Sequence, residues 1–226
     1  MKKIFTLIAI VMMAVGAQAQ TYSITFSEVA AKGSLNGKTF GSDGFILTCT
    51  DPKEEKLQVD ENSCLFGTAE EYDQYSYRLK TNGKSSSNNK LTLSVPKAGT
   101  LTIAVRSASS SATDRNVVLT QDGTELFNQF LKDADAVEIT IEGEENPKKV
   151  FPYISMEVAA GTIDITYPEN GINFYAFILE TSSTTGIESV KAVENENAPM
   201  YNLAGQQVDK NFKGVVIQNG KKFINK

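Results

Sequence analysis

Residues Leu91–Arg106, LTLSVPKAGTLTIAVR, alternate apolar and polar side chains on both sides of a short turn. Leu91–Val95 and Leu101–Arg106 each have a period of two, and the turn residues Pro96–Gly99 separate them. This alternation is typical of antiparallel strands that cover a core with one face and meet water with the other. The stretch therefore predicts two consecutive strands of an antiparallel β protein.

Similar runs continue on both sides of this stretch, and almost no helical periodicity interrupts them. Turn residues such as Asp122-Gly123 separate the runs, and about ten short strands at such spacing are typical of two packed sheets. The sequence therefore predicts an all-β, jelly-roll-like, two-sheet antiparallel β-sandwich plus a small C-terminal β tail domain. The other expected strands of the sandwich are 23–26, 45–50, 116–120, 124–127, 137–141, 154–158, 163–167 and 172–179.

Two corners of the sandwich have similar sequences. Gly99-Thr100-Leu101-Thr102-Ile103 follows Val95, and Gly161-Thr162-Ile163-Asp164-Ile165 follows Val158. The similarity is too short for a duplicated domain. We interpret it as a sign of equivalent corners in a jelly roll.

The two ends of the chain differ from the body. A charged start, an apolar run from Ile4 to Val15 and a small-x-small pattern at Ala17-Gln18-Ala19 predict a cleaved signal peptide over residues 1–19. No other run is apolar enough to span a membrane, so no span is expected after its removal. The remaining boundaries are a sandwich domain over 20–180, a polar linker over 181–198 and a tail over 199–226.

Charge and composition exclude several classes of function. The chain has a formal net charge of −5, although its tail carries five lysines against one aspartate. The acidic body argues against nucleic acid as a partner, because phosphate binding needs clustered lysine and arginine. The absence of histidine excludes Ser-His-Asp and Cys-His catalysis and most zinc enzymes. Paired carboxylates such as Glu54-Glu55 lie in polar runs, so we expect no enzyme.

The chain has two cysteines, Cys49 and Cys64. In an exported protein they either form a disulfide or remain two buried thiols on separate strands, and the sequence leaves both arrangements open. We expect no cofactor. A structural calcium ion is compatible with the carboxylates of Glu28, Asp43 and Asp164.

An aromatic segment, EEYDQYSY, places Tyr72, Tyr75 and Tyr77 close together. A sugar ring stacks on an aromatic ring while its hydroxyl groups need polar partners. Tyr72 in an exposed loop, with Tyr75 and Tyr77 on one strand face, would offer such a surface. The alternative is ordinary packing of half-buried strand tyrosines, which the lack of tryptophan favours.

A polar site is also compatible with two arginines and an asparagine. Arg106 ends an alternating run, and Arg115 follows a serine-rich loop. Together with Asn173 they could contact a uronic acid or a sulfate, because a guanidinium fork matches a pair of anionic oxygens. The alternative is an internal brace between arginine and Asp114 that holds the loop.

The run VPKAGTLTIAVRSASSSATDRNVVL, followed by GTIDITYPENGINFYAFIL, covers most of Leu79–Glu180. It resembles the carbohydrate-binding-module-like jelly-roll domains found beside pectate lyases in secreted Bacteroidetes-type proteins. The similar features are the Gly-Thr-Leu-Thr-Ile corner, the Arg-Ser…Asp-Arg stretch and the last strand with Asn173-Phe174-Tyr175. The resemblance implies the fold, and only weakly a ligand.

The tail has a resemblance of its own. Tyr201–Gln206, Val208, Lys213–Ile217 and Asn219–Lys222 form the pattern YNLxGQxV, KGxxIxNGKK. This pattern resembles the C-terminal sorting domains associated with type IX secretion. The resemblance implies that export or surface-attachment machinery reads the tail.

These observations predict a secreted or surface-exposed, non-catalytic module that binds carbohydrate, either a polysaccharide or a host glycan. The alternative is a structural or adhesion protein that binds a protein partner. In both cases the expected location is extracellular or on the outer cell surface. The candidate ligand-binding residues are Tyr72, Tyr75, Arg106, Arg115 and Asn173.

Overall fold

The computed structural model describes residues 19–53, 55–181, 199–202, 205–209, 211–218 and 221–225. The chain divides into two compact units, Met1–Ser183 and Thr184–Lys226, and each is described by itself. Apart from Ala19 and Thr181, the expected signal peptide and linker lie outside the described residues. Within the described ranges, no helix is long and apolar enough to cross a membrane.

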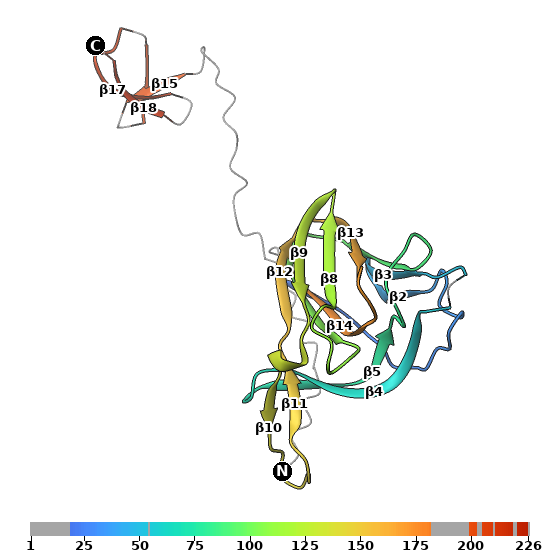
Figure 1. Cartoon of the computed structure of the whole chain (residues 1–226). Coiled ribbons are helices and arrows are strands. Elements are labelled where there is room, and N and C mark those ends of the chain that lie inside the picture. The colour runs from blue at the N-terminus through green and yellow to red at the C-terminus, as the bar shows by residue number, and fades with distance from the viewer. Residues whose placement is uncertain are drawn as a thin grey trace. The chain divides into compact units, whose positions relative to one another are not determined.

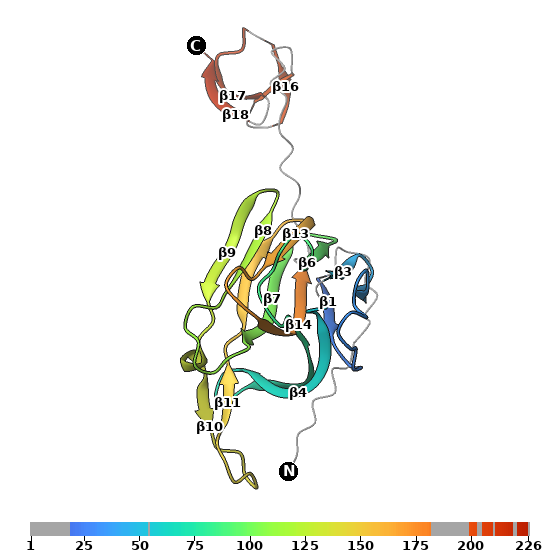
Figure 2. The same cartoon turned by 45° about the vertical axis from the view of Figure 1, so that its right-hand side comes forward.

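The first unit is a sandwich of an eight-stranded and a six-stranded sheet (Figures 1 and 2), which confirms the predicted all-β sandwich. The eight-stranded sheet has the order β10-β11-β4-β5-β14-β7-β12, with β1 paired to β14, and the six-stranded sheet has the order β2-β3-β6-β13-β8-β9. Among the described pairings of this unit, β11 runs parallel to β4 and the others are antiparallel. The strands are β1 (Gln20–Thr25), β2 (Thr39–Ser42), β3 (Phe45–Thr50), β4 (Gln58–Gly67), β5 (Tyr72–Lys80), β6 (Lys90–Val95), β7 (Gly99–Ser107), β8 (Asn116–Gln121), β9 (Thr124–Phe130), β10 (Val137–Ile139), β11 (Lys148–Phe151), β12 (Ile154–Val158), β13 (Gly161–Thr166) and β14 (Ile172–Thr181).

The main core lies between the two sheets, because alternate residues of each strand face inward. In β6, Leu91, Leu93 and Val95 are buried while the residues between them are more exposed. Each fully buried leucine contributes about 1.5–3 kcal/mol of hydrophobic free energy. The period-two pattern of the sequence therefore sets both the strands and the face that they bury.

The two corners of similar sequence are adjacent in space. The chain crosses from one sheet to the other between β6 and β7, and crosses back between β12 and β13. β6 pairs with β13, and β7 pairs with β12, so Val95 lies opposite Gly161 and Gly99 opposite Val158. A Cβ atom at Gly99 would lie 2.2 Å from the carbonyl oxygen of Glu180, so only glycine fits there. The corners are equivalent, as the sequence indicates.

A second, smaller cluster lies on the outer face of the eight-stranded sheet. Along β7, Ile103 and Val105 belong to the main core, whereas Ala104, between them, belongs to this outer cluster. In β14 a β-bulge between Phe174 and Ala176 shifts the register, and both Tyr175 and Ala176 join the outer cluster. The other buried members are Cys64, Phe66 and Phe151.

The cysteines are two free, buried thiols rather than a disulfide. Cys49 lies on β3 in the main core, and Cys64 lies on β4 in the outer cluster. Because the two clusters lie on opposite faces of the eight-stranded sheet, the thiols cannot pair without movement of the backbone.

We expect neither thiol to react with Ellman's reagent in the native protein at pH 8 without reductant. Burial, and then the nearby Asp51 carboxylate, raises the pKa of Cys49 to about 12, and burial also raises the pKa of Cys64. The thiolate is the reactive form, so both thiols are protected by protonation as well as by burial. Unfolding in denaturant should expose two thiols per chain. An unfolded, unreduced protein with no reactive thiol would contradict the structure, because it would contain a disulfide.

The second unit is a small four-stranded sheet, as expected for a C-terminal β domain. β17 pairs with β18, and Gln218 lies opposite Lys221, while Asn219 and Gly220, whose sequence predicts a hairpin turn, lie outside the described residues. The strands are β15 (Met200–Asn202), β16 (Gln207–Val208), β17 (Gly214–Gln218) and β18 (Lys221–Asn225).

Candidate functional site

The outer face of the eight-stranded sheet carries a group of aromatic rings centred on Phe66. The Phe66 ring centroid lies 5.1 Å from that of Tyr175 and 5.8 Å from that of Tyr153. It lies 6.0 Å from the ring centroids of both Tyr75 and Phe151. Such contacts between rings add about 0.5–1.5 kcal/mol each beyond the area that they bury. This group is called the outer aromatic cluster below.

Arg106, near the end of β7, lies over this cluster. The centre of its guanidinium group is 5.3 Å from the Phe151 ring centroid, a distance suited to a cation–π contact. Its Nε donates a hydrogen bond to the Tyr175 hydroxyl at 3.3 Å, and that hydroxyl donates to Asn62 Oδ1 at 2.7 Å. The ring and the two polar groups hold the guanidinium group in a defined position.

A chain of hydroxyl groups extends from the cluster towards the solvent. The Tyr75 and Tyr153 hydroxyl oxygens are 2.9 Å apart, and Tyr153 donates to Asp73 Oδ2 at 2.7 Å. Burial is the largest cause that raises the pKa of both tyrosines, and for Tyr153 the bonds to Tyr75 and Asp73 raise it further. These hydroxyls therefore stay protonated at physiological pH and fix the Tyr153 ring at the edge of the cluster.

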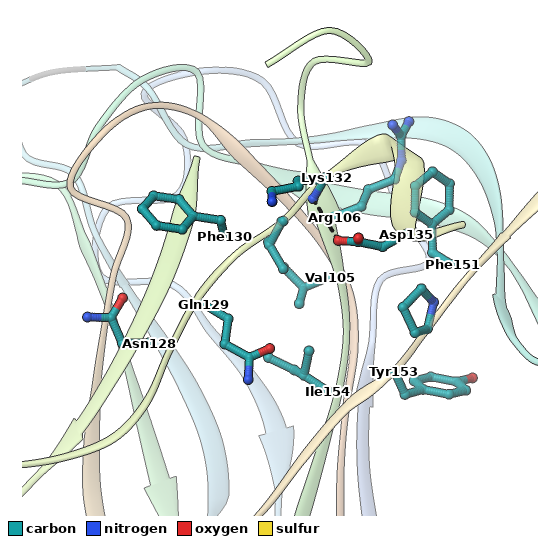
Figure 3. Close-up of a pocket in the computed structure, with 12 residues that line it drawn as sticks. Val105, Arg106, Asn128, Gln129, Phe130, Lys132, Asp135, Phe151, Tyr153 and Ile154 are labelled. Atoms are coloured by element: carbon teal, nitrogen blue, oxygen red, sulfur yellow. Dashed lines mark hydrogen bonds between the residues drawn. The ribbon is translucent and has the colours of Figure 1, made fainter. Parts of the chain in front are cut away.

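A cleft of about 540 Å³ opens beside this edge, between β9 of one sheet and β12 of the other. We call it the β9–β12 cleft. In Figure 3 the Phe130 ring lies on one side and the Phe151 and Tyr153 rings lie on the other, with the Gln129 side chain between them. Phe130 is 55% exposed, which is unusual for so large an apolar side chain. The other lining residues are Val105, Arg106, Asn128, Leu131, Lys132, Asp135, Pro152 and Ile154.

A second hollow, of about 410 Å³, lies on the other side of Arg106 and Phe151, which line both spaces. Its carboxylates are already paired, since Lys149 contacts Asp133 and Lys148 contacts Glu144 at 3.2 Å. Arg106 and Phe151 therefore form a ridge between two adjacent hollows. The remaining lining residues are Ser63, Cys64, Leu65, Gln74, Ser110 and Ile141.

The structure brings together only part of the predicted ligand-binding set. Arg106 lines both hollows, and Tyr75 contacts the cleft residue Tyr153. Tyr72 is 37% exposed but begins strand β5 instead of lying in a loop, and it lines neither hollow. Arg115 donates from Nη1 to the Gly171 carbonyl at 2.8 Å, so it braces a loop through the backbone and not through Asp114.

Asn173 is fully buried, although it was expected in an exposed polar site. It lies beside Arg106 in the pairing of β14 with β7, and neither polar atom of its carboxamide has a hydrogen-bond partner among the described residues. Tyr72, Arg106 and Asn173 therefore do not meet on one exposed face.

Tyr75 and Tyr77 also differ from expectation, because they pack against different clusters. Tyr75 belongs with the outer aromatic cluster, and Tyr77 packs against the main core. A β-bulge between Glu61 and Cys64 on the partner strand β4 shifts the register between the two tyrosines.

Sequence reasoning missed the cleft residues Phe130, Gln129 and Tyr153. Phe130 and Gln129 follow the short expected strand 124–127, and nothing in their spacing marks them as exposed. Tyr153 follows Pro152 between two strands, of which only the second was expected. The aromatic and proline residues in Phe151-Pro152-Tyr153 are the one local signal that could have indicated a special connection.

The calcium ligands considered from the sequence do not gather into a site. Among the described residues, no group of three or more histidine, cysteine, aspartate or glutamate side chains could hold a metal ion, so Glu28, Asp43 and Asp164 form no such group. Asp43 instead accepts a hydrogen bond from the Ser42 hydroxyl at 2.8 Å.

No protein-family model matches the chain, and no curated protein matches it. It is similar to the catalytic unit of a thermostable GH87 alpha-1,3-glucanase from Streptomyces thermodiastaticus strain HF3-3, with 15% identity over 65% of this chain and a TM-score of 0.34. It is also similar to the catalytic domain of a GH87 alpha-1,3-glucanase in complex with nigerose, with 10% identity over 60% of this chain and a TM-score of 0.31. The chain spans 28% of the length of either protein. Similarity this distant carries no weight for the function of the chain.

Proposed function

We propose that this protein is a secreted or surface-exposed, non-catalytic module that binds carbohydrate in the β9–β12 cleft. The observation that carries the proposal is the arrangement of the rings of Phe130 and Tyr153 around an open cleft with the Gln129 amide between them. Sugar rings stack on aromatic surfaces, and amide groups pair with their hydroxyls. The signal-peptide and tail patterns support export to the cell exterior, where surface-attachment machinery would read the tail.

Binding is proposed instead of cleavage because of the charges in the cleft. Glycoside hydrolysis commonly needs two carboxyl groups on either side of the scissile bond. Among the described lining residues of the cleft, Asp135 supplies the one carboxylate, and its Oδ2 accepts a hydrogen bond from the Lys132 backbone N–H at 3.1 Å.

We expect Phe130→Ala to weaken binding to a soluble polysaccharide about tenfold or more, because truncation of a central aromatic anchor typically costs about 2 kcal/mol or more. Affinity electrophoresis against polygalacturonate, xylan, hyaluronan and dextran would identify the bound class, and calorimetry would measure the change. Tyr72→Ala is the matched control, since it removes an exposed ring that lines neither hollow. If the folded protein binds no polysaccharide, or if Tyr72→Ala and Phe130→Ala act alike, the cleft is not a carbohydrate site.

The second candidate is an adhesion protein that binds a protein partner. It is favoured by the position of β9, which is an edge strand of the six-stranded sheet. The last residue of β9, Phe130, is exposed. An unpaired edge strand can accept a strand from another chain through backbone hydrogen bonds. In that case the protein would bind a protein ligand from which all glycans have been removed, and it would bind none of the four polysaccharides.

A further inference from the structure

We propose, building on the carbohydrate-binding function above, that the ligand is an acidic polysaccharide. In this proposal Arg106 receives the anionic group of a sugar in the interior of the ligand chain. The anion is a uronate carboxylate or a sulfate ester, which present the same kind of oxygen pair to a guanidinium fork.

The first support is the lack of a counter-charge at Arg106. Two arginines lie on this face of the sheet, and Arg78 is paired with both carboxylate oxygens of Asp60, at 2.6 Å and 3.1 Å. Arg106 has no carboxylate within 4 Å among the described residues. Its oxygen contacts are neutral and long, namely the Tyr175 hydroxyl at 3.3 Å, the Ser107 carbonyl at 3.4 Å and Asn62 Oδ1 at 3.5 Å.

The row of residues that pair with Arg106 across the sheet contains no carboxylate. Arg106 pairs across the sheet with Asn173, Asn173 with Lys80, and Lys80 with Gln58. This row of four residues on the outer face therefore contains two cations and two neutral amides. Asn173 is fully buried and has no partner among the described residues, so it cannot compensate the charge of Arg106.

The charge of the two hollows differs in sign from that of the whole protein. The chain as a whole is acidic, with a formal charge of −5. The described lining residues of the two hollows include four cations against three carboxylates, so the site is locally positive. Two of the three carboxylates, Asp133 and Glu144, already contact lysines. Arg106 and Lys132 are the described lining cations whose side chains have no carboxylate partner, and Arg106 is the one that lines both hollows.

The position of Arg106 also specifies where the charged sugar sits in the ligand. Because Arg106 and Phe151 form the ridge between the hollows, a sugar bound to the guanidinium has space for neighbouring sugars on both sides. This arrangement suits an internal unit of a polymer more than a chain end. The cation–π contact with Phe151 holds the fork in place, which reduces the entropy lost on binding.

The test compares charged polymers with their neutral counterparts at about 0.15 M salt, where long-range charge effects are screened. One arm uses polygalacturonate against fully methyl-esterified polygalacturonate, and the other uses dextran sulfate against dextran. Wild-type protein should prefer the charged member of at least one pair by about tenfold or more, since a hydrogen-bonded charge pair typically contributes over 1.4 kcal/mol. The arm that shows the preference distinguishes a carboxylate from a sulfate.

Arg106→Gln should abolish this preference, and Arg106→Lys should restore only part of it because the planar guanidinium fork is lost. Lys97→Gln is the matched control, because it removes one positive charge at an exposed residue outside both hollows. Melting curves check the fold of each variant. If Arg106→Gln fails to fold, competition by free galacturonate against free galactose on wild-type protein supplies the same comparison.

The outcomes separate this inference from the proposed function. Binding of neutral polymers without preference for charge would overturn the acidic ligand and leave a carbohydrate-binding module. The same holds if Arg106→Gln and Lys97→Gln reduce the preference equally, which would indicate non-specific attraction. If wild-type protein binds no polymer in either arm, the proposed function fails as well.

Discussion

Phe66→Ala is expected to lower the free energy of unfolding of the sandwich by about 3–5 kcal/mol. Phe66 is completely buried, and its ring contacts four other rings on the outer face of the eight-stranded sheet. Removal of the ring leaves a cavity that Tyr153, Tyr175 and their neighbours cannot fill without losing their hydrogen bonds. Urea unfolding measures the change as a lower midpoint at an unchanged slope.

Two further variants test this explanation. Phe66→Leu should lower the free energy of unfolding less than Phe66→Ala, because leucine keeps much of the volume of the phenylalanine side chain. Phe130→Ala, which truncates an exposed ring, should change stability by no more than about 0.5 kcal/mol. A loss below about 1 kcal/mol for Phe66→Ala would show that the outer aromatic cluster is not packed as described.

The period-two pattern in the sequence predicts strands with one apolar face. β6 alternates between buried and less buried positions, and β7 does so except at Ala104, which packs in the outer cluster. The pattern appears directly in Leu91–Val95 and Leu101–Arg106. Each of these strands covers the main core, so a period of two follows from its position in the sheet. The corner glycines are recognisable for a related reason, because the close approach at Gly99 excludes any side chain.

In the sandwich, the sequence does not predict β2, β4 and β11, and of β5 it predicts only the part that carries Tyr75 and Tyr77. β4 and β5 are long strands, yet polar residues alternate poorly along them because a β-bulge interrupts their pairing between Glu61 and Cys64. Their outer faces also carry polar and aromatic groups such as Asp60, Arg78 and Tyr75, which cover a second cluster instead of meeting only water. The alternation is therefore weak where a bulge and a second cluster interrupt it, as in β4 and β5.

The site is less predictable than the fold because its residues come from separate elements. Arg106 stands out in the sequence because it ends an apolar alternation, and it does line both hollows. Phe130 and Tyr153 come from strand ends on two different sheets, and only the pairing order brings them to one cleft. Asn173 has the residue type of a ligand contact, but none of its surface is exposed.

Between pH 10 and pH 12, wild-type protein is expected to lose about 3 kcal/mol more of its free energy of unfolding than Tyr175→Phe does. Burial, and then the neighbouring Cys64, raises the pKa of Tyr175 to about 12, whereas Arg106 and Arg78 act in the opposite direction. In the unfolded chain the same phenol titrates near pH 10. Because the folded state holds the proton more tightly, its contribution is complete below pH 10 and disappears as the pH rises through about 12.

Urea unfolding at several pH values between 8 and 12 measures this difference between wild type and variant. Near neutral pH the variant should lose only about 1 kcal/mol, because the hydrogen bond from Tyr175 to Asn62 is absent. Absorbance of tyrosinate at high pH gives an independent check, since the phenol missing from the variant should titrate near pH 12 in the folded protein. If that phenol titrates near pH 10, Tyr175 is not buried beneath Arg106, and the ridge between the two hollows would have a different structure.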